Sequence, residues 1–262
     1  MCFEYDATPP DLPATFPLRF ASATSGQDLV LTAADGAQFS AYIARPSTSN
    51  GAGIVILPDV RGLFSFYREL ADRFASTGIQ ALAIDYFGRT AGLGSRDEHF
   101  EYMPHVEQTH AETIAMDVAA AVAYLRQLPE DAPRNIFTVG FCFGGGNSFQ
   151  QAANKHGLSG VIGFYGPPKR ARSGPTPIER VSEFECPVLG LFGGADQGIP
   201  VEDVKQFDDA LTQAKVEHEI IIYPGAPHSF FDRKFEEYKD ACDDAWTRML
   251  AFITIHTPQI KD

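Results

Sequence analysis

A cysteine lies between two glycines in a pattern that is typical of catalytic nucleophiles. The segment Gly140-Phe141-Cys142-Phe143-Gly144 follows the apolar run 136–139 and leads through two further glycines into a helical segment. In a Gly-x-nucleophile-x-Gly turn the nucleophile takes a strained backbone conformation, and the glycines avoid collisions with the neighbouring strand and helix. The unpaired amides at a helix start also favour the reactive thiolate. The sequence therefore predicts that Cys142 is a nucleophile.

The alternative for any cysteine in a reducing environment is a buried, unreactive core position. We interpret Cys186, beside a proline at a strand start, and Cys242, on an apolar helix face, in this way. Cys2 is close to the N-terminus. For Cys142 the glycine spacing and the strand-to-helix setting favour the nucleophile.

A cysteine nucleophile needs a base and a group that orients the base, and both types of residue occur where strands are expected to end. Asp196 follows the apolar run 188–192, and His228 follows the run 219–223 in a loop rich in glycine and proline. The carboxyl ends of parallel strands meet at one edge of a sheet, so both residues are expected near Cys142. The chain order of nucleophile, acid and histidine is that of the α/β hydrolases. We predict a triad of Cys142, His228 and Asp196.

Two backbone amides are expected to hold the oxyanion that forms when the nucleophile attacks. One is the amide of Phe143, directly after the nucleophile, and the other is the amide of Val60, just beyond the apolar run 54–57. Asp59 would then be an acid beside the thiol, which holds the thiol proton at rest or positions the thiol. A role for Asp59 as a helix cap is less favoured, because Ser65 can cap the following helix.

The elements that must position these residues alternate along the chain. Short apolar runs, typical of parallel strands covered on both faces, are separated by amphipathic segments, typical of helices. The expected strands are 54–57, 79–84, 136–139, 161–164, 188–192 and 219–223, and the expected helices are 66–76, 112–128, 145–155, 201–214 and 235–253. Before them, 29–31 and 37–44 flank Asp35-Gly36, which predicts a hairpin with a tight turn. The sequence thus predicts a single α/β domain over 29–262, with a mostly parallel sheet, helices on both faces, an antiparallel N-terminal hairpin and an irregular lead-in over 1–28.

Two long connections, 86–107 and 166–185, follow strands and are expected at the rim of the site. The second contains Lys169-Arg170-Ala171-Arg172, which is either a solvated charged loop or a segment that attracts anions.

Composition excludes several classes of function. The chain has 262 residues, 21 basic and 34 acidic side chains, and a formal charge of −13, which argues against a nucleic acid partner. Its start does not resemble a secretory signal, and its apolar runs are too short to span a membrane. Four scattered cysteines without a CxxC pair favour a cytoplasmic location. Nucleotide-binding glycine motifs are absent, so nucleotide binding is not favoured. The remaining histidines have no ligand spacing and are expected at surface or core positions: His99, His105, His110, His156, His218 and His256.

At these motifs the chain resembles the dienelactone hydrolase family of α/β hydrolases, also called carboxymethylenebutenolidases. The resemblance covers about residues 29–253 and is carried by the elbow 140–145, by Phe-Gly-Gly-Ala before Asp196, by Pro-Gly-Ala-Pro-His-Ser-Phe over 224–230 and by Ile-Asp-Tyr-Phe-Gly-Arg over 84–89. It implies an α/β-hydrolase fold, with Cys142 as nucleophile, His228 as base and Asp196 as its orienter, and with no metal or other cofactor.

The same resemblance implies that Arg89 binds a carboxylate of the substrate. The family has a glutamate and an aromatic residue where this chain has Asp59 and Arg61, so Arg61 is a second candidate for substrate binding. The second family arginine is expected four residues after the histidine, where Asp232 stands and Arg233 is displaced by one. The alternative for Arg89 is a salt bridge with Asp85 or another rim acid.

Leaving-group chemistry narrows the substrate. A thiolate, with a reference pKa of ~8.5, leaves a tetrahedral intermediate more readily than an alkoxide, so alkyl esters and amides are poor substrates. We expect an esterase for activated esters, above all a small enol lactone or dienelactone with a carboxylate. The alternatives are a broad carboxylesterase or thioesterase with the same triad, and a binding protein that keeps the pocket without catalysis. The sequence leaves the oligomeric state open.

Overall fold

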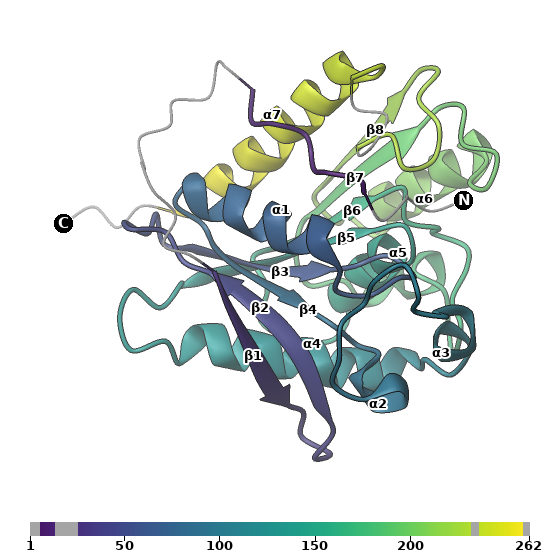
Figure 1. The fold of residues 1–262 in the computed structure, drawn as a ribbon. Helices are drawn as coiled ribbons and strands as arrows, with labels where there is room; N and C mark the ends of the chain where they lie inside the picture. Colours follow the sequence, from purple (N-terminus) through teal and green to yellow (C-terminus); the bar gives the residue numbers. More distant parts are fainter. Residues whose placement is uncertain (1–5, 14–25, 232–235, 259–262) are drawn as a thin grey trace.

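The computed structural model describes residues 6–13, 26–231 and 236–258. Within them, eight strands form one sheet in the order β1-β2-β4-β3-β5-β6-β7-β8 (Figure 1). The strands are β1 Gln27–Thr32, β2 Gln38–Ala44, β3 Ala52–Leu57, β4 Gln80–Ile84, β5 Asn135–Phe141, β6 Gly160–Phe164, β7 Val188–Gly193 and β8 His218–Tyr223. Strands β3 to β8 pair in parallel, whereas β2 pairs antiparallel with both β1 and β4. The mostly parallel sheet and the antiparallel N-terminal hairpin are thus confirmed.

The hairpin turn is looser than expected. Only Gly36 of the Asp-Gly pair has a positive φ, at 86°. Asp35 instead accepts a hydrogen bond from the amide of Ala37 at 3.2 Å through its side chain. The connection runs over residues 33–37, because a two-residue type I′ turn at Asp35-Gly36 would need a positive φ at both residues.

Helices cover both faces of the sheet. They are α1 Ser65–Ser76, α2 Gly88–Ala91, α3 Met103–Glu107, α4 Ala111–Arg126, α5 Phe143–Gln151, the 3-10 helix η1 Ile178–Glu183, α6 Val201–Gln213 and α7 Lys239–Ile255. Helices α1 and α7 lie together on one face, and α4 lies on the other (Figure 1). The rings of Phe74 in α1 and Trp246 in α7 meet with centroids 5.3 Å apart.

The central strands divide their side chains between two apolar clusters. In β3, Ile54 and Ile56 belong to the cluster that includes α1 and α7, whereas Val55 and Leu57 belong to the cluster that includes α4. All four are fully buried, as expected for a parallel strand between two helical layers. The end of β3, and the loop that follows it, are fixed from both faces.

Three local details differ from the expectations. Helix α5 begins at Phe143 rather than Gly145, because the turn at Cys142 leads directly into it. Ser65 is the first residue of α1 and not its cap; the cap position is Phe64, which makes no side-chain hydrogen bond. The two long connections are not entirely irregular, since they contain α2, α3 and η1.

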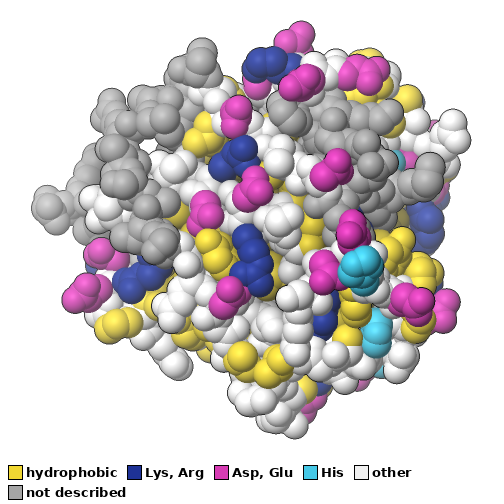
Figure 2. All heavy atoms as spheres, viewed as in Figure 1, with side chains coloured by type: hydrophobic (Ala, Val, Ile, Leu, Met, Phe, Trp, Pro, Cys, Tyr) yellow, Lys and Arg dark blue, Asp and Glu magenta, His cyan; other side chains and the backbone are white. Residues whose placement is uncertain are grey.

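The surface facing the viewer in Figure 2 carries acidic and basic side chains close to one another. Ion pairs such as Arg73–Asp11, at 3.0 Å, occur among the described residues. No helix among the described residues is long and apolar enough to cross a bilayer.

Candidate active site

Cys142 occupies a strained turn between β5 and α5. Its φ and ψ are 55° and −114°, a left-handed backbone that side chains other than glycine rarely adopt. The turn is held on both sides, because the Cys142 amide donates to the carbonyl of Phe164 at 3.0 Å and the Cys142 carbonyl accepts from the amide of Gly146 at 3.2 Å. The neighbouring elements therefore hold Cys142 in a conformation that it would not adopt alone.

The flanking glycines are required by the backbone itself. A Cβ on Gly140 would lie 1.9 Å from the carbonyl oxygen of Gly144. A Cβ on Gly144 would lie 2.1 Å from the oxygen of Leu57 and 2.3 Å from that of Pro58. The start of α5 thus contacts the end of β3 directly, backbone against backbone.

Asp196 and His228 meet at the ends of β7 and β8. The distance from His228 Nδ1 to Asp196 Oδ2 is 2.6 Å, and the Asp196 side chain is 2% exposed. Asp196 Oδ1 accepts hydrogen bonds from the amides of Gly198 and Ile199, at 2.7 and 3.1 Å. Burial raises the pKa of Asp196, but the hydrogen bond and charge of His228 and the two amides outweigh it, so the pKa lies below its usual value.

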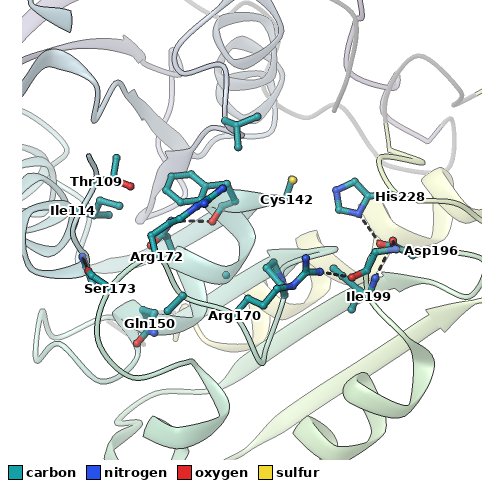
Figure 3. A pocket seen from close by; sticks show the side chains of 18 of the residues that line it. Thr109, Ile114, Cys142, Gln150, Arg170, Arg172, Ser173, Asp196, Ile199 and His228 are labelled. Carbon is teal, nitrogen blue, oxygen red and sulfur yellow. Dashed lines mark hydrogen bonds and ion pairs between the residues drawn. The ribbon is translucent and has the colours of Figure 1, made fainter. Parts of the chain in front are cut away.

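One pocket of about 750 Å³ joins these residues. Cys142, Asp196 and His228 all line it, and Figure 3 shows the Cys142 sulfur facing the same space as the imidazole. The structure therefore brings the three predicted triad residues to one site. A carboxylate that only accepts hydrogen bonds places the proton on Nδ1 and leaves Nε2 able to take a proton from a thiol or a water.

The two amides expected to hold an oxyanion also belong to this site. Val60 and Phe143 both line the pocket. Phe143 opens α5, so its amide has no acceptor within the helix. Val60 follows β3, whose end contacts α5 through Gly144.

Asp59 and Arg61 form a buried ion pair behind Val60. Their side chains are 0% and 2% exposed, and Arg61 Nη2 lies 2.7 Å from Asp59 Oδ2. The Asp59 carboxylate also accepts a hydrogen bond from the Arg61 amide at 2.7 Å, and the Arg61 guanidinium lies 4.1 Å from the centre of the Phe64 ring. Neither residue lines the described pocket. Contact of Asp59 with the thiol and of Arg61 with substrate stay predictions.

Arg89 lies away from the pocket lining and is bound by two carboxylates. Its Nη2 is 2.7 Å from Asp117, whose side chain is fully buried in α4, and it also pairs with Asp35 in the hairpin turn. Burial raises the pKa of Asp117 to about 6, although the hydrogen bonds and charge of Arg89 oppose the shift. This geometry corresponds to the alternative of a salt bridge and gives no support to substrate binding by Arg89. The second family position, at Asp232 and Arg233, lies outside the described residues.

Several residues at the site were not singled out from the sequence as members of it. Tyr165, which follows β6 with a φ of 37°, is fully buried outside the pocket lining, with its ring centre 4.9 Å from that of His228. Thr109 lines the pocket from the loop before α4, Ile114 from α4 and Gln150 from α5. Only the position of Tyr165 directly after a strand could have indicated it, because the others depend on how the helices lie on the sheet.

Metal ligands are not grouped in the described part of the chain. Within residues 6–13, 26–231 and 236–258, no three or more His, Cys, Asp or Glu side chains are arranged to hold an ion.

Sequence comparisons relate the chain to a known family. A family model described as the dienelactone hydrolase family matches residues 39–257. A provisionally named carboxymethylenebutenolidase of Synechocystis sp. is 30% identical over 221 residues, which cover 81% of this chain and 89% of that protein. A protein of Escherichia coli K12 with the same provisional name is 27% identical over 254 residues, covering 91% and 92% of the two chains.

Solved structures agree with the sequence comparisons. The crystal structure of a provisionally named dienelactone hydrolase from Klebsiella pneumoniae superposes with a TM-score of 0.74 at 25% identity, over 88% of this chain and 99% of the other. An esterase of Pyrococcus furiosus superposes with a TM-score of 0.68 at 14% identity, over 96% and 98%. The second likeness shows the shared fold alone. The expected α/β-hydrolase fold is confirmed.

Proposed function

Since the chain belongs to the dienelactone hydrolase family and is a hydrolase of ester bonds, we propose that it cleaves activated esters through a Cys142, His228 and Asp196 triad. The proposed substrate is a small enol lactone or dienelactone that bears a carboxylate. The observation that carries the proposal is the strained Cys142 turn opening on the pocket that also contains the 2.6 Å His228–Asp196 hydrogen bond.

The first half of the proposed reaction forms an acyl-enzyme. His228 Nε2 first takes the proton of the Cys142 thiol. The thiolate attacks the carbonyl carbon, and the electron pair of the carbonyl moves to oxygen, which accepts hydrogen bonds from the Val60 and Phe143 amides. When the pair returns, the bond to the leaving oxygen breaks, and His228 supplies the proton to that oxygen. The product is an acyl-thioester on Cys142.

The second half releases the acid. His228 Nε2 removes a proton from water, whose oxygen attacks the thioester carbonyl. The carbon–sulfur bond then breaks and the thiolate is restored. Asp196 favours both halves because its ionised carboxylate orients the imidazole and stabilises the imidazolium.

The thiol also sets the substrate class. Because a thiolate with a reference pKa of ~8.5 competes with the alcohol for departure, productive turnover needs a leaving group of comparable acidity. Phenols, thiols and the enol released from an enol lactone meet this condition, whereas simple alcohols do not.

The test compares Cys142→Ala with the wild type on a 4-nitrophenyl ester. We expect kcat/KM to fall about a thousandfold or more, because the nucleophile is lost. Mass spectrometry of the quenched wild type should find the acyl group on the peptide that contains Cys142.

Cys186→Ala is the matched control. Burial, followed by the charge of Glu185, raises the pKa of Cys186 to about 12, and this residue does not line the described pocket. Its loss should leave activity near the wild-type value. Full activity of Cys142→Ala would refute the triad proposal.

A second candidate is a broad carboxylesterase or thioesterase with the same triad. The binding of Arg89 by Asp117 and Asp35 favours it, because the family's expected carboxylate ligand is occupied. Turnover of neutral aryl esters or acyl-thioesters above that of dienelactones would select this candidate.

We also propose a cytoplasmic location for the enzyme. The support is the scatter of four cysteines without a CxxC pair, which fits a reducing compartment.

A further inference from the structure

The loop after β6 brings several basic side chains to the rim of the pocket. Lys169, Arg170 and Arg172 lie within four residues, and Arg170 and Arg172 both line the pocket. In a chain with a formal charge of −13, this local excess of positive charge is unusual. Among the described lining residues, Asp196 is the sole carboxylate, and it is bound by His228.

The loop is tied to helices on both sides of the pocket. Lys169 Nζ lies 2.9 Å from Asp203 in α6, and Arg170 donates to the carbonyl of Gly198 just before α6. On the other side, the amide of Ala111, the first residue of α4, donates to Ser173 Oγ at 2.8 Å. These contacts hold the segment between them in place across the pocket.

Arg172 lies between the residues that make these contacts and takes part in none of them. Among residues 6–13, 26–231 and 236–258, no side chain or carbonyl accepts a hydrogen bond or forms an ion pair with Arg172. Two of the three basic residues therefore maintain the loop, and the third leaves its guanidinium to the pocket. A guanidinium presents a planar set of donors that matches a carboxylate.

The position of Arg172 also indicates which part of a substrate it would meet. In Figure 3, Cys142 lies between His228 on one side and Arg172 on the other. His228 protonates the leaving oxygen in the proposed reaction, so in an open-chain ester the leaving group lies on its side and the acyl chain extends the opposite way. Ile114 lines that side of the pocket with apolar surface.

We propose that Arg172 binds a carboxylate at the far end of the acyl group, so that among open-chain esters the enzyme prefers half-esters of dicarboxylic acids. This inference rests on the proposed function, because the orientation of the acyl group follows from the roles of Cys142 and His228. It assigns to Arg172 the anion contact that Arg89 cannot make while bound by Asp117 and Asp35.

The test uses two 4-nitrophenyl esters of similar size, the half-ester of glutaric acid and the ester of pentanoic acid. The measured quantity is the ratio of their kcat/KM values. We expect Arg172→Ala to lower this ratio about tenfold or more, the loss typical of a hydrogen bond to a charged group. Arg172→Lys should restore part of the ratio, because it returns the charge without the paired donors.

Lys205→Ala is the matched control, since it removes one positive charge at an exposed residue of α6 that does not line the described pocket. It should keep the ratio within about twofold, as expected for a distant exposed charge. An unchanged ratio in Arg172→Ala, or an equal fall in Lys205→Ala, would overturn the inference.

A binding measurement separates this inference from the proposed chemistry. The half-amide of glutaric acid resists cleavage by a thiol, so its affinity can be measured by calorimetry without catalysis. Weaker binding to Arg172→Ala than to the wild type supports the carboxylate contact even if Cys142→Ala proves active. Equal binding to both proteins refutes the contact even if the triad is correct.

Discussion

Asp196 is buried yet fully supplied with hydrogen-bond donors. One carboxylate oxygen accepts from His228, and the other accepts from the amides of Gly198 and Ile199. These contacts lower the pKa of Asp196 below its usual value, so that the acid stays ionised, and they fix the orientation of the imidazole ring. A group with a lowered pKa in the folded state also stabilises that state at neutral pH.

The variant Asp196→Asn tests this contribution. Its free energy of unfolding should be about 1–2 kcal/mol below that of the wild type at neutral pH, because a charged hydrogen bond is lost. The wild-type advantage is present above the unfolded pKa of ~3.9 and disappears as pH falls through the lower folded value. Urea unfolding at pH 7 and near the folded pKa measures both differences. A difference that is constant with pH would contradict the assignment.

At the scale of secondary-structure elements, Arg89 joins three parts of the chain. From the short helix α2 it reaches Asp117 in α4 and Asp35 in the hairpin turn. Removing a cation from a buried carboxylate leaves an unpaired charge, which is strongly destabilising.

The expected result of Arg89→Ala is therefore lost stability rather than altered specificity. At pH 7 the free energy of unfolding should fall by about 2–3 kcal/mol. Asp117 already has a pKa raised to about 6, and without Arg89 it binds a proton still more readily in the folded state. The loss should thus be smaller at pH 5 than at pH 7, as measured by urea unfolding.

Kinetics completes the test of Arg89. The glutarate-to-pentanoate ratio of kcat/KM should stay within about twofold in this variant, since exposed or distant charges contribute little. Asp35→Ala, which removes only the more exposed partner, is the control and should destabilise less. A tenfold fall of the ratio would instead return Arg89 to the substrate site.

At this scale, the sequence could predict those features that depend on residues close to one another in the chain. The Cys142 turn was recognisable because a side chain at 140 or 144 would collide with the backbone, so that both positions require glycine. The strand ends before Asp196 and His228 were recognisable from their apolar runs. The partner of Arg89 was not, because Asp117 lies 28 residues away and is brought close only by the placement of α4 on the sheet.

Across the whole molecule, Trp246 connects the two ends of the chain. It is the single tryptophan, it packs on Phe74 of α1 and Phe231 beyond β8, and its indole donates to the carbonyl of Pro10 at 3.2 Å. Its fluorescence therefore reports on the face of the sheet that is covered by α1 and α7.

We propose that residues 29–262 form one cooperative domain, and Trp246 provides the measurement. Unfolding in urea should give the same midpoint by tryptophan fluorescence and by far-UV circular dichroism, because strands such as β3 supply side chains to both apolar clusters. Hydrogen exchange in α4, on the opposite face, should show the same global stability. Separate midpoints for the two faces would indicate independent folding units.

The contact of Gly144 with Leu57 and Pro58 has an evolutionary consequence. It sets the spacing between the start of α5 and the end of β3 through main-chain atoms alone, so no neighbouring side chain has to maintain it. Mutations in the loop that carries Arg172 can then change which acids are accepted while the reacting centre keeps its dimensions. Selection for a new substrate would act on that loop first, and we expect relatives with the same elbow to diverge there.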